Sequence, residues 1–180
     1  MAYYTIGIDP GFGGTGLALF RGNHLYSVVW LRKVGKRPFE ERAHLLAINI
    51  RDWLEHEMQQ EEAPQVGIVG RPLIVCEIPG YQNTPSRSMG WKKGDLQKLT
   101  YLVGAIGQAC ATLELCDDPP LFPVYSTVTP AGWKGQLSKE IVINRIRKRM
   151  PDVDEKFSPK LDVWDAIGIG LWAMYERPTN

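Results

Sequence analysis

Two apolar stretches that each end in an acidic residue constrain the fold of this chain. Asp9 ends the stretch TIGID, and Glu77 ends the stretch LIVCE. Continuous apolar runs rich in β-branched residues are typical of strands that are buried on both faces of a sheet. A carboxylate that ends such a strand emerges at the C-terminal edge of the sheet, where α/β proteins usually place their sites. We therefore expect an α/β fold with acidic side chains gathered at this edge.

The rest of the chain divides into further strands and helices. Strands are predicted near residues 3–9, 15–20, 24–31, 72–77 and 121–125, and helices near 39–60, 91–114, 138–149 and 160–175. The glycines of GFGGTG predict a tight turn between the first two strands, which lets backbone or nucleic acid approach Asp9 closely. This segment lacks the Gly-Lys-Ser/Thr ending of a P-loop. With 180 residues, the whole range 1–180 is predicted to form one domain.

A second pair of acids, Asp162 and Asp165, lies in the sequence KLDVWDAIGIGLW. On a helix, residues three apart have Cβ atoms about 5–6 Å from each other on one face. Asp165 directly precedes an apolar run, so we expect it against the core, where an unpaired carboxylate is costly. Taken singly, Asp9 is as typical of a turn as of a metal ligand, whereas Asp162 is better explained as a solvated acid in a first helical turn.

Taken as a set, the four acids favour a metal site. Clustered carboxylates raise one another's pKa unless cations neutralise them. Two Mg²⁺ ions about 3.5–4 Å apart would do so and would clamp the attacking and leaving oxygens of a phosphodiester displacement. Oxygen ligands favour Mg²⁺, or Mn²⁺ in its place, over zinc. The three histidines, by contrast, show no paired ligand spacing and are interpreted as surface or packing residues.

The order of these segments resembles the RuvC family of Holliday junction resolvases. The similar segments are IGIDPGFGGTGLALF, the strand ending in Glu77, VTPAGWKGQLSKEIV and the helix with Asp-Xaa-Xaa-Asp-Ala, and together they span nearly the whole chain. The resemblance implies a ribonuclease H-like mixed sheet flanked by helices, a homodimer, and four acidic residues that act with Mg²⁺. By motif match these residues are Asp9, Glu77, Asp162 and Asp165.

The resemblance also suggests roles for two lysines. Lys139, in KEIV, matches the basic residue of the family at the start of the following helix. The segment TPAGWK, which contains Lys134, looks more like phage-encoded relatives than the bacterial enzyme. Tyr125, Ser126 and Thr127 stand where another basic residue of the bacterial pattern would be. Lys139 and Lys134 are therefore candidates to bind phosphate or to stabilise the charge of the transition state.

The net charge of +1 conceals a strongly uneven distribution. Fourteen of the 21 Lys and Arg residues lie in the segments 32–37, 87–98 and 134–149. With the four proposed metal ligands set aside, the rest of the chain carries a formal charge of +5, which is +1 less −4. These clusters favour a phosphate-binding face. For the stretch RIRKR at 145–149, a solvated helix end explains the charges equally well.

The loop after Glu77 mixes aromatic and basic residues. Tyr81 and Trp91 alternate there with Arg87, Lys92 and Lys93. Such a mixture suits unstacked bases and phosphates, and stacking contributes about 1–3 kcal/mol per base. Packing of the loop onto the domain explains Tyr81 equally well and Trp91 better. We name Tyr81, Arg87, Lys92, Lys93, Lys134 and Lys139 as candidate DNA-binding residues.

These features together predict a Mg²⁺-dependent endonuclease that resolves four-way DNA junctions as a homodimer. The alternatives are a ribonuclease H-like nuclease on RNA–DNA hybrids or flaps, and a catalytically idle DNA-binding subunit. An odd number of cysteines (Cys76, Cys110 and Cys116) without metal-binding spacing predicts a reduced, cytoplasmic protein. No apolar run approaches the ~18 residues of a membrane span, and no signal sequence precedes the first strand.

Overall fold

The chain folds around one five-stranded mixed sheet. The computed structural model describes residues 4–32, 35–59, 71–79, 94–113 and 122–176. The strand order across the sheet is β3-β2-β1-β4-β5. The strands are β1 (Tyr4–Pro10), β2 (Gly14–Arg21), β3 (His24–Arg32), β4 (Leu73–Glu77) and β5 (Val124–Val128). The first three strands are antiparallel neighbours, whereas β4 is parallel to both β1 and β5. This is the mixed α/β sheet that was predicted.

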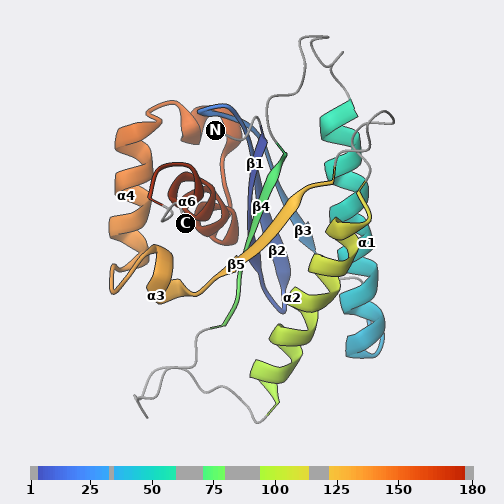
Figure 1. The fold of residues 1–180 in the computed structure, drawn as a ribbon. Helices are drawn as coiled ribbons and strands as arrows, with labels where there is room; N and C mark the ends of the chain where they lie inside the picture. The colour runs from blue at the N-terminus through green and yellow to red at the C-terminus, as the bar shows by residue number, and fades with distance from the viewer. Residues whose placement is uncertain (1–3, 33–34, 60–70, 80–93, 114–121, 177–180) are drawn as a thin grey trace.

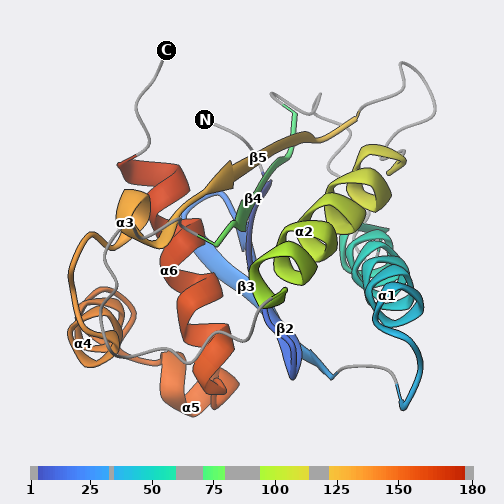
Figure 2. The same cartoon turned by 90° about the horizontal axis from the view of Figure 1, so that it is seen from below.

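Helices cover both faces of the sheet (Figure 1). They are α1 (Phe39–Gln59), α2 (Asp95–Ala111), α3 (Pro130–Trp133), α4 (Lys139–Arg149), α5 (Val153–Phe157) and α6 (Leu161–Tyr175). Figure 2 shows α1 and α2 on one face, with α3 to α6 on the other. Among the described residues, no helix is long and apolar enough to cross a membrane.

Two features of the fold differ from the sequence prediction. The last strand runs from Val124 to Val128 and not over 121–125, because its parallel pairing with β4 places Val128 beside Glu77. The short helices α3 and α5 were not predicted, since four or five residues give too little periodicity. The N-terminal end of the predicted 91–114 helix lies partly outside the described residues, and α2 begins at Asp95.

The core forms two layers, one on each face of the sheet. Ile6, Ile8 and Cys76 pack against α1 and α2. Phe20 and Val75 face the opposite side and pack with the residues of α6. The apolar stripe predicted for α1 is buried at Leu46, Ile50, Leu54 and Met58, whereas Trp53 is half-buried. Burial of β1 and β4 on both faces agrees with their continuous apolar sequences.

Close contact between α6 and the first two strands depends on two glycines. A Cβ atom on Gly7 would collide with the backbone oxygen of Ala166, and one on Gly16 would collide with the backbone oxygen of Asp162. Because glycine has no side chain, the backbone of α6 can lie directly on β1 and β2. Gly16, the last glycine of GFGGTG, thus admits the helix backbone beside Asp9, its pairing partner on β1.

Candidate metal centre

The structure brings the four predicted acids to one end of the molecule. Ile8 of β1 pairs with Cys76 of β4, so Asp9, the penultimate residue of β1, and Glu77, the last residue of β4, lie at the same end of two parallel strands. Asp162 and Asp165 lie in the first two turns of α6. The backbone of Asp162 lies over Gly16, which is the β2 partner of Asp9. Two strand ends and one helix start therefore supply the four carboxylates.

The ionised form of Asp9 is strongly disfavoured. Burial raises the pKa of Asp9 well above its ordinary value, and the neighbouring charges of Glu77, Asp165 and Asp162 raise it further. Lys139 acts in the opposite direction with the smallest of these effects. The four acids are thus close enough to interact electrostatically, as their predicted clustering requires.

Glu77 is held by an unexpected partner. Its pKa is raised, mainly by burial, although a hydrogen bond from Trp133 and the charge of Lys134 both favour the ionised form. The indole Nε1 of Trp133 donates to Glu77 Oε2 over 2.6 Å. A short bond of this kind to a carboxylate is characteristic of a charge-assisted interaction.

Asp165 is paired with the two lysines that the family resemblance singled out. Its side chain is buried, as its position before an apolar run predicted. Lys139 Nζ lies 2.7 Å from Asp165 Oδ2, whereas Lys134 Nζ lies 3.7 Å from Oδ1. Within the described residues, Oδ1 has no hydrogen-bond partner. The structure thus places both lysines at the acidic edge, and Lys139 makes the closer ion pair.

Asp162 also accepts a hydrogen bond from a tryptophan. Trp30 Nε1, near the end of β3, donates to Asp162 Oδ2 over 3.0 Å. Neither Trp30 nor Trp133 was predicted as a site residue from the sequence. The sequence offered one clue to such a role, because the indole N–H of a buried tryptophan usually finds a hydrogen-bond acceptor. The sequence did not show that these acceptors are the acids of the site.

The donor chemistry fits a divalent cation, although the side chains do not form a ready ligand set. The four carboxylates and two ammonium groups carry a formal charge of −2, four negative charges against two positive. Carboxylate oxygens are the ligands that Mg²⁺ and Mn²⁺ prefer. No three His, Cys, Asp or Glu side chains in the described part of the chain converge closely enough to hold an ion. The expected two-metal arrangement is therefore not preformed.

Comparisons with known proteins agree on the architecture. No protein-family model matches the sequence, and no curated protein matches it significantly. A structure of T. thermophilus RuvC in complex with a Holliday junction substrate superposes with a TM-score of 0.63 at 19% identity, covering 96% of this chain and 93% of that chain. The chain has a RuvC-like fold. A second Thermus thermophilus RuvC structure gives a TM-score of 0.60 at 18% identity, covering 96% of this chain and 94% of that chain.

Only two of the six candidate DNA-binding residues lie within the described part of the chain. Tyr81, Arg87, Lys92 and Lys93 lie outside the described residues, as does Trp91. Lys134 and Lys139 lie at the acidic edge.

The basic stretch 145–149 has mixed roles. Arg147 donates to both carboxylate oxygens of Asp154, at 2.6 and 3.1 Å, and lies over the ring of Trp164. Arg149 lies over the ring of Tyr175, 3.9 Å from its centroid. Part of this stretch therefore links α4 to neighbouring helices, a role that neither the phosphate-binding nor the solvated-helix-end interpretation predicted.

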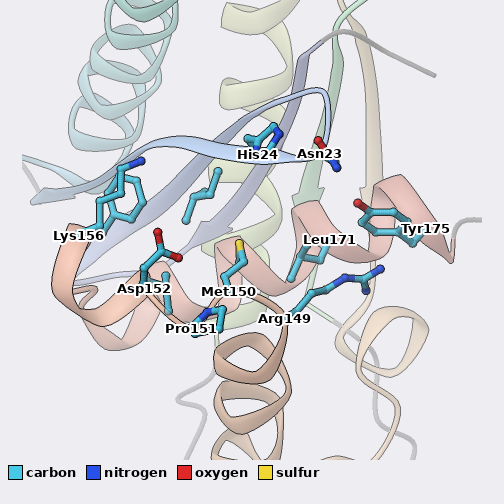
Figure 3. A pocket seen from close by; sticks show the side chains of 12 residues that line it. Asn23, His24, Arg149, Met150, Pro151, Asp152, Lys156, Leu171 and Tyr175 are labelled. Carbon is cyan, nitrogen blue, oxygen red and sulfur yellow. The ribbon is translucent and has the colours of Figure 1, made fainter.

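A pocket of about 430 Å³ lies away from the acids. Figure 3 shows His24, Arg149, Lys156 and Tyr175 around it. It is formed by the β2–β3 turn, the end of α4, α5 and the C-terminal half of α6. Because the acids lie at the start of α6, this pocket is separate from the candidate metal centre.

Proposed function

We propose that the protein is a divalent-metal-dependent endonuclease that resolves four-way DNA junctions. The observation that carries this proposal is the cluster of four mutually repelling carboxylates at one sheet edge of a RuvC-like fold. A cluster of like charges is unfavourable unless a cation or a cationic partner offsets it. Holding a metal ion against a phosphodiester is a function that offsets this repulsion.

The chain's own residues have distinct roles in this proposal. Asp9, whose charge interacts with those of the other three acids, would hold the metal together with Glu77, Asp162 and Asp165. When bound, Mg²⁺ or Mn²⁺ supplies an activated water and stabilises the charge that develops on the phosphate. Lys139 would balance Asp165 in the metal-free protein and bind the phosphate in the DNA complex. Lys134, farther from Asp165, would assist in binding the DNA.

The proposal includes a homodimer, because a four-way junction has approximate two-fold symmetry and needs two related sites. Tyr101 and Gly104 are exposed on α2, where a second copy could pack. The stripe residues Val103, Ile106 and Cys110 are buried within the chain and are not available to a partner. We further propose that residues 1–180 form a single nuclease domain of the phage type that works in the cytoplasm.

Branched DNA is favoured over a hybrid because basic and aromatic residues are concentrated in the sequence segment that follows Glu77. Ribonuclease H-like recognition of a hybrid would need contacts to ribose 2′-hydroxyls across a shallow minor groove. Unpaired or distorted bases at a junction suit stacking on Tyr81 together with phosphate contacts from Arg87, Lys92 and Lys93.

The decisive assay compares labelled four-way junction, RNA–DNA hybrid and plain duplex, with and without Mg²⁺. We expect paired nicks near the exchange point of the junction only when Mg²⁺ is present. Asp9→Asn should abolish cutting while junction binding is kept or strengthened, because one negative charge near phosphate is removed. A preference for the hybrid would favour the ribonuclease H-like alternative. If the wild type binds the junction but does not cut it with any of the divalent metals tested, an idle DNA-binding subunit is favoured.

A further inference from the structure

We propose that Trp30 and Trp133 are positioning residues whose indole N–H groups orient Asp162 and Glu77 for binding of a divalent cation. This inference rests on the proposed function, since it assigns the partners of two proposed metal ligands. Each indole donates to one carboxylate oxygen, Asp162 Oδ2 in one case and Glu77 Oε2 in the other.

Trp133 is fixed on several sides. Its side chain is buried, and its ring packs so closely on α6 that a Cβ atom on Gly168 would meet it at 2.5 Å. Thr129 caps the start of α3 by accepting a hydrogen bond from the Gly132 backbone N–H. Lys134 Nζ also lies 4.8 Å from the centroid of the Trp133 ring. The N–H donor is therefore held in place before any ligand binds.

Trp30 is fixed by different neighbours. Its ring lies over Gly14, where a Cβ atom would approach it at 2.7 Å. Lys160, which immediately precedes α6, places Nζ 4.1 Å from the centroid of the ring. The hydrogen bond to Asp162 thus links the edge strand β3 to the beginning of α6. Removal of this donor would free the Asp162 side chain without deleting its charge.

As the partner of a metal-binding carboxylate, a neutral N–H donor is more suitable than a lysine ammonium group. It fixes the carboxylate plane and favours the ionised form, yet it leaves the negative charge for a cation. It also occupies only one oxygen, so the other oxygen of Glu77 or Asp162 remains available. Asp165 differs, because Lys139 already offsets its charge. Outer partners that orient metal ligands in this way typically change metal affinity or activity by about 10–100-fold when removed.

The test replaces each donor while keeping an aromatic ring. Trp133→Phe and Trp30→Phe are compared with Trp172→Phe, a half-buried tryptophan of α6 in the same apolar layer. Mn²⁺ binding is measured from the paramagnetic resonance of the free ion, and the Mg²⁺ concentration for half-maximal junction cleavage is measured separately. We expect both site variants to bind Mn²⁺ roughly tenfold or more weakly and to need correspondingly more Mg²⁺. The Trp172→Phe variant should match the wild type in both measurements.

Several outcomes separate this inference from the proposed function. If the wild type binds Mn²⁺ and Glu77→Gln weakens that binding, unchanged affinity in both tryptophan variants overturns the indole assignment. Weakened Mn²⁺ binding in both variants supports the assignment even if the wild type cuts no junction, whereas the absence of cutting rejects the resolvase proposal alone. Thermal melting checks the folding of each variant. If Trp133→Phe fails to fold, the less buried Trp30→Phe decides the outcome by itself.

Discussion

At the scale of single residues, burial and the neighbouring negative charges together raise the pKa of Asp9. Its raised pKa means that the folded protein binds a proton there more strongly than the unfolded chain does. The ionised carboxylate therefore destabilises the metal-free fold at any pH above that raised pKa. This penalty is relieved as the pH falls through the folded pKa toward the ordinary value of 3.8. A bound cation would relieve the same penalty at neutral pH, which couples metal binding to stability.

Asp9→Asn should consequently be more stable than the wild type at neutral pH in the presence of a chelator. Each kcal/mol gained would raise Tm by about 2–4 °C in a protein of this size. The difference should shrink as the pH falls through the folded pKa of Asp9, because the wild-type side chain then becomes neutral as well. Urea unfolding of both proteins across this pH range measures the effect. A stability difference that does not change with pH would contradict the electrostatic account.

The two lysines should not contribute equally to stability. Lys139→Ala leaves the buried carboxylate of Asp165 without its 2.7 Å partner, so we expect a loss of about 1–3 kcal/mol in the free energy of unfolding. Lys134→Ala should cost less, because its ammonium group lies 3.7 Å from the same side chain. Urea unfolding with a chelator provides the comparison. Equal losses, or a larger loss for Lys134→Ala, would show that the ion-pair distances do not control stability here.

At the scale of elements, the position of α6 against β1 and β2 determines where Asp162 and Asp165 lie. The helix approaches so closely because Gly7 and Gly16 carry no side chains. A displacement of α6 would also disturb the hydrogen bond between Trp30 and Asp162. The geometry of the site therefore depends on backbone packing as well as on the acidic residues themselves.

Gly16→Ala should move the start of α6, because its new Cβ atom would collide with the backbone of Asp162 and Val163. We expect a loss of about 3 kcal/mol in the free energy of unfolding, together with weaker Mn²⁺ binding. Gly13→Ala is the matched control, since a Cβ atom there meets nothing within 4 Å. That control should stay within about 0.5 kcal/mol of the wild type. Similar losses in the two variants would contradict the packing argument.

At the scale of the whole molecule, cations and acids are unevenly distributed. The acidic edge includes Lys134 and Lys139, and α4 adds the exposed Arg145 and Lys148 farther along the chain. The whole chain has nearly equal numbers of basic and acidic residues, but a local group of cations can still bind phosphate strongly.

Junction binding by the catalytically inactive Asp9→Asn variant should weaken steeply with salt. The logarithm of affinity should fall against the logarithm of salt concentration with a slope of about −0.9 for each phosphate neutralised. Replacement of one lysine that is proposed to bind phosphate, as in Lys134→Gln, should make this slope shallower by about 1. Titrations of labelled junction at several salt concentrations measure the slope. Affinity that is independent of salt would count against a phosphate-binding face.

The proposed dimer is a separate prediction about the assembled molecule. Sedimentation at micromolar concentration, with and without junction DNA, should show two copies of the chain. Exposure of Tyr101 on α2 predicts that Tyr101→Glu weakens association, because a charge would replace an apolar contact. The exposed Thr112, just beyond the C-terminal end of α2, offers a control substitution to Glu. A monomer under all conditions would contradict the proposed assembly.

The sequence alone determined the features that depend on local periodicity. Continuous apolar runs identified β1 and β4 as buried strands, and the acids that follow these runs placed Asp9 and Glu77 at one sheet edge. The three-residue spacing of Asp162 and Asp165 predicted that they share a helix face, and α6 contains both. These conclusions hold because side-chain direction repeats every two residues in a strand and every 3.6 residues in a helix.

Only the tertiary structure decided which groups surround the acids. Trp30 reaches Asp162 across 132 positions of the sequence, and Trp133 reaches Glu77 across 56. The register of β5 and the closer pairing of Lys139 with Asp165 likewise follow from packing between distant segments. Local patterns carry no information about such contacts, because their geometry is set by how helices and strands pack. The sequence therefore identified the acids, whereas the fold determined the partners that hold them.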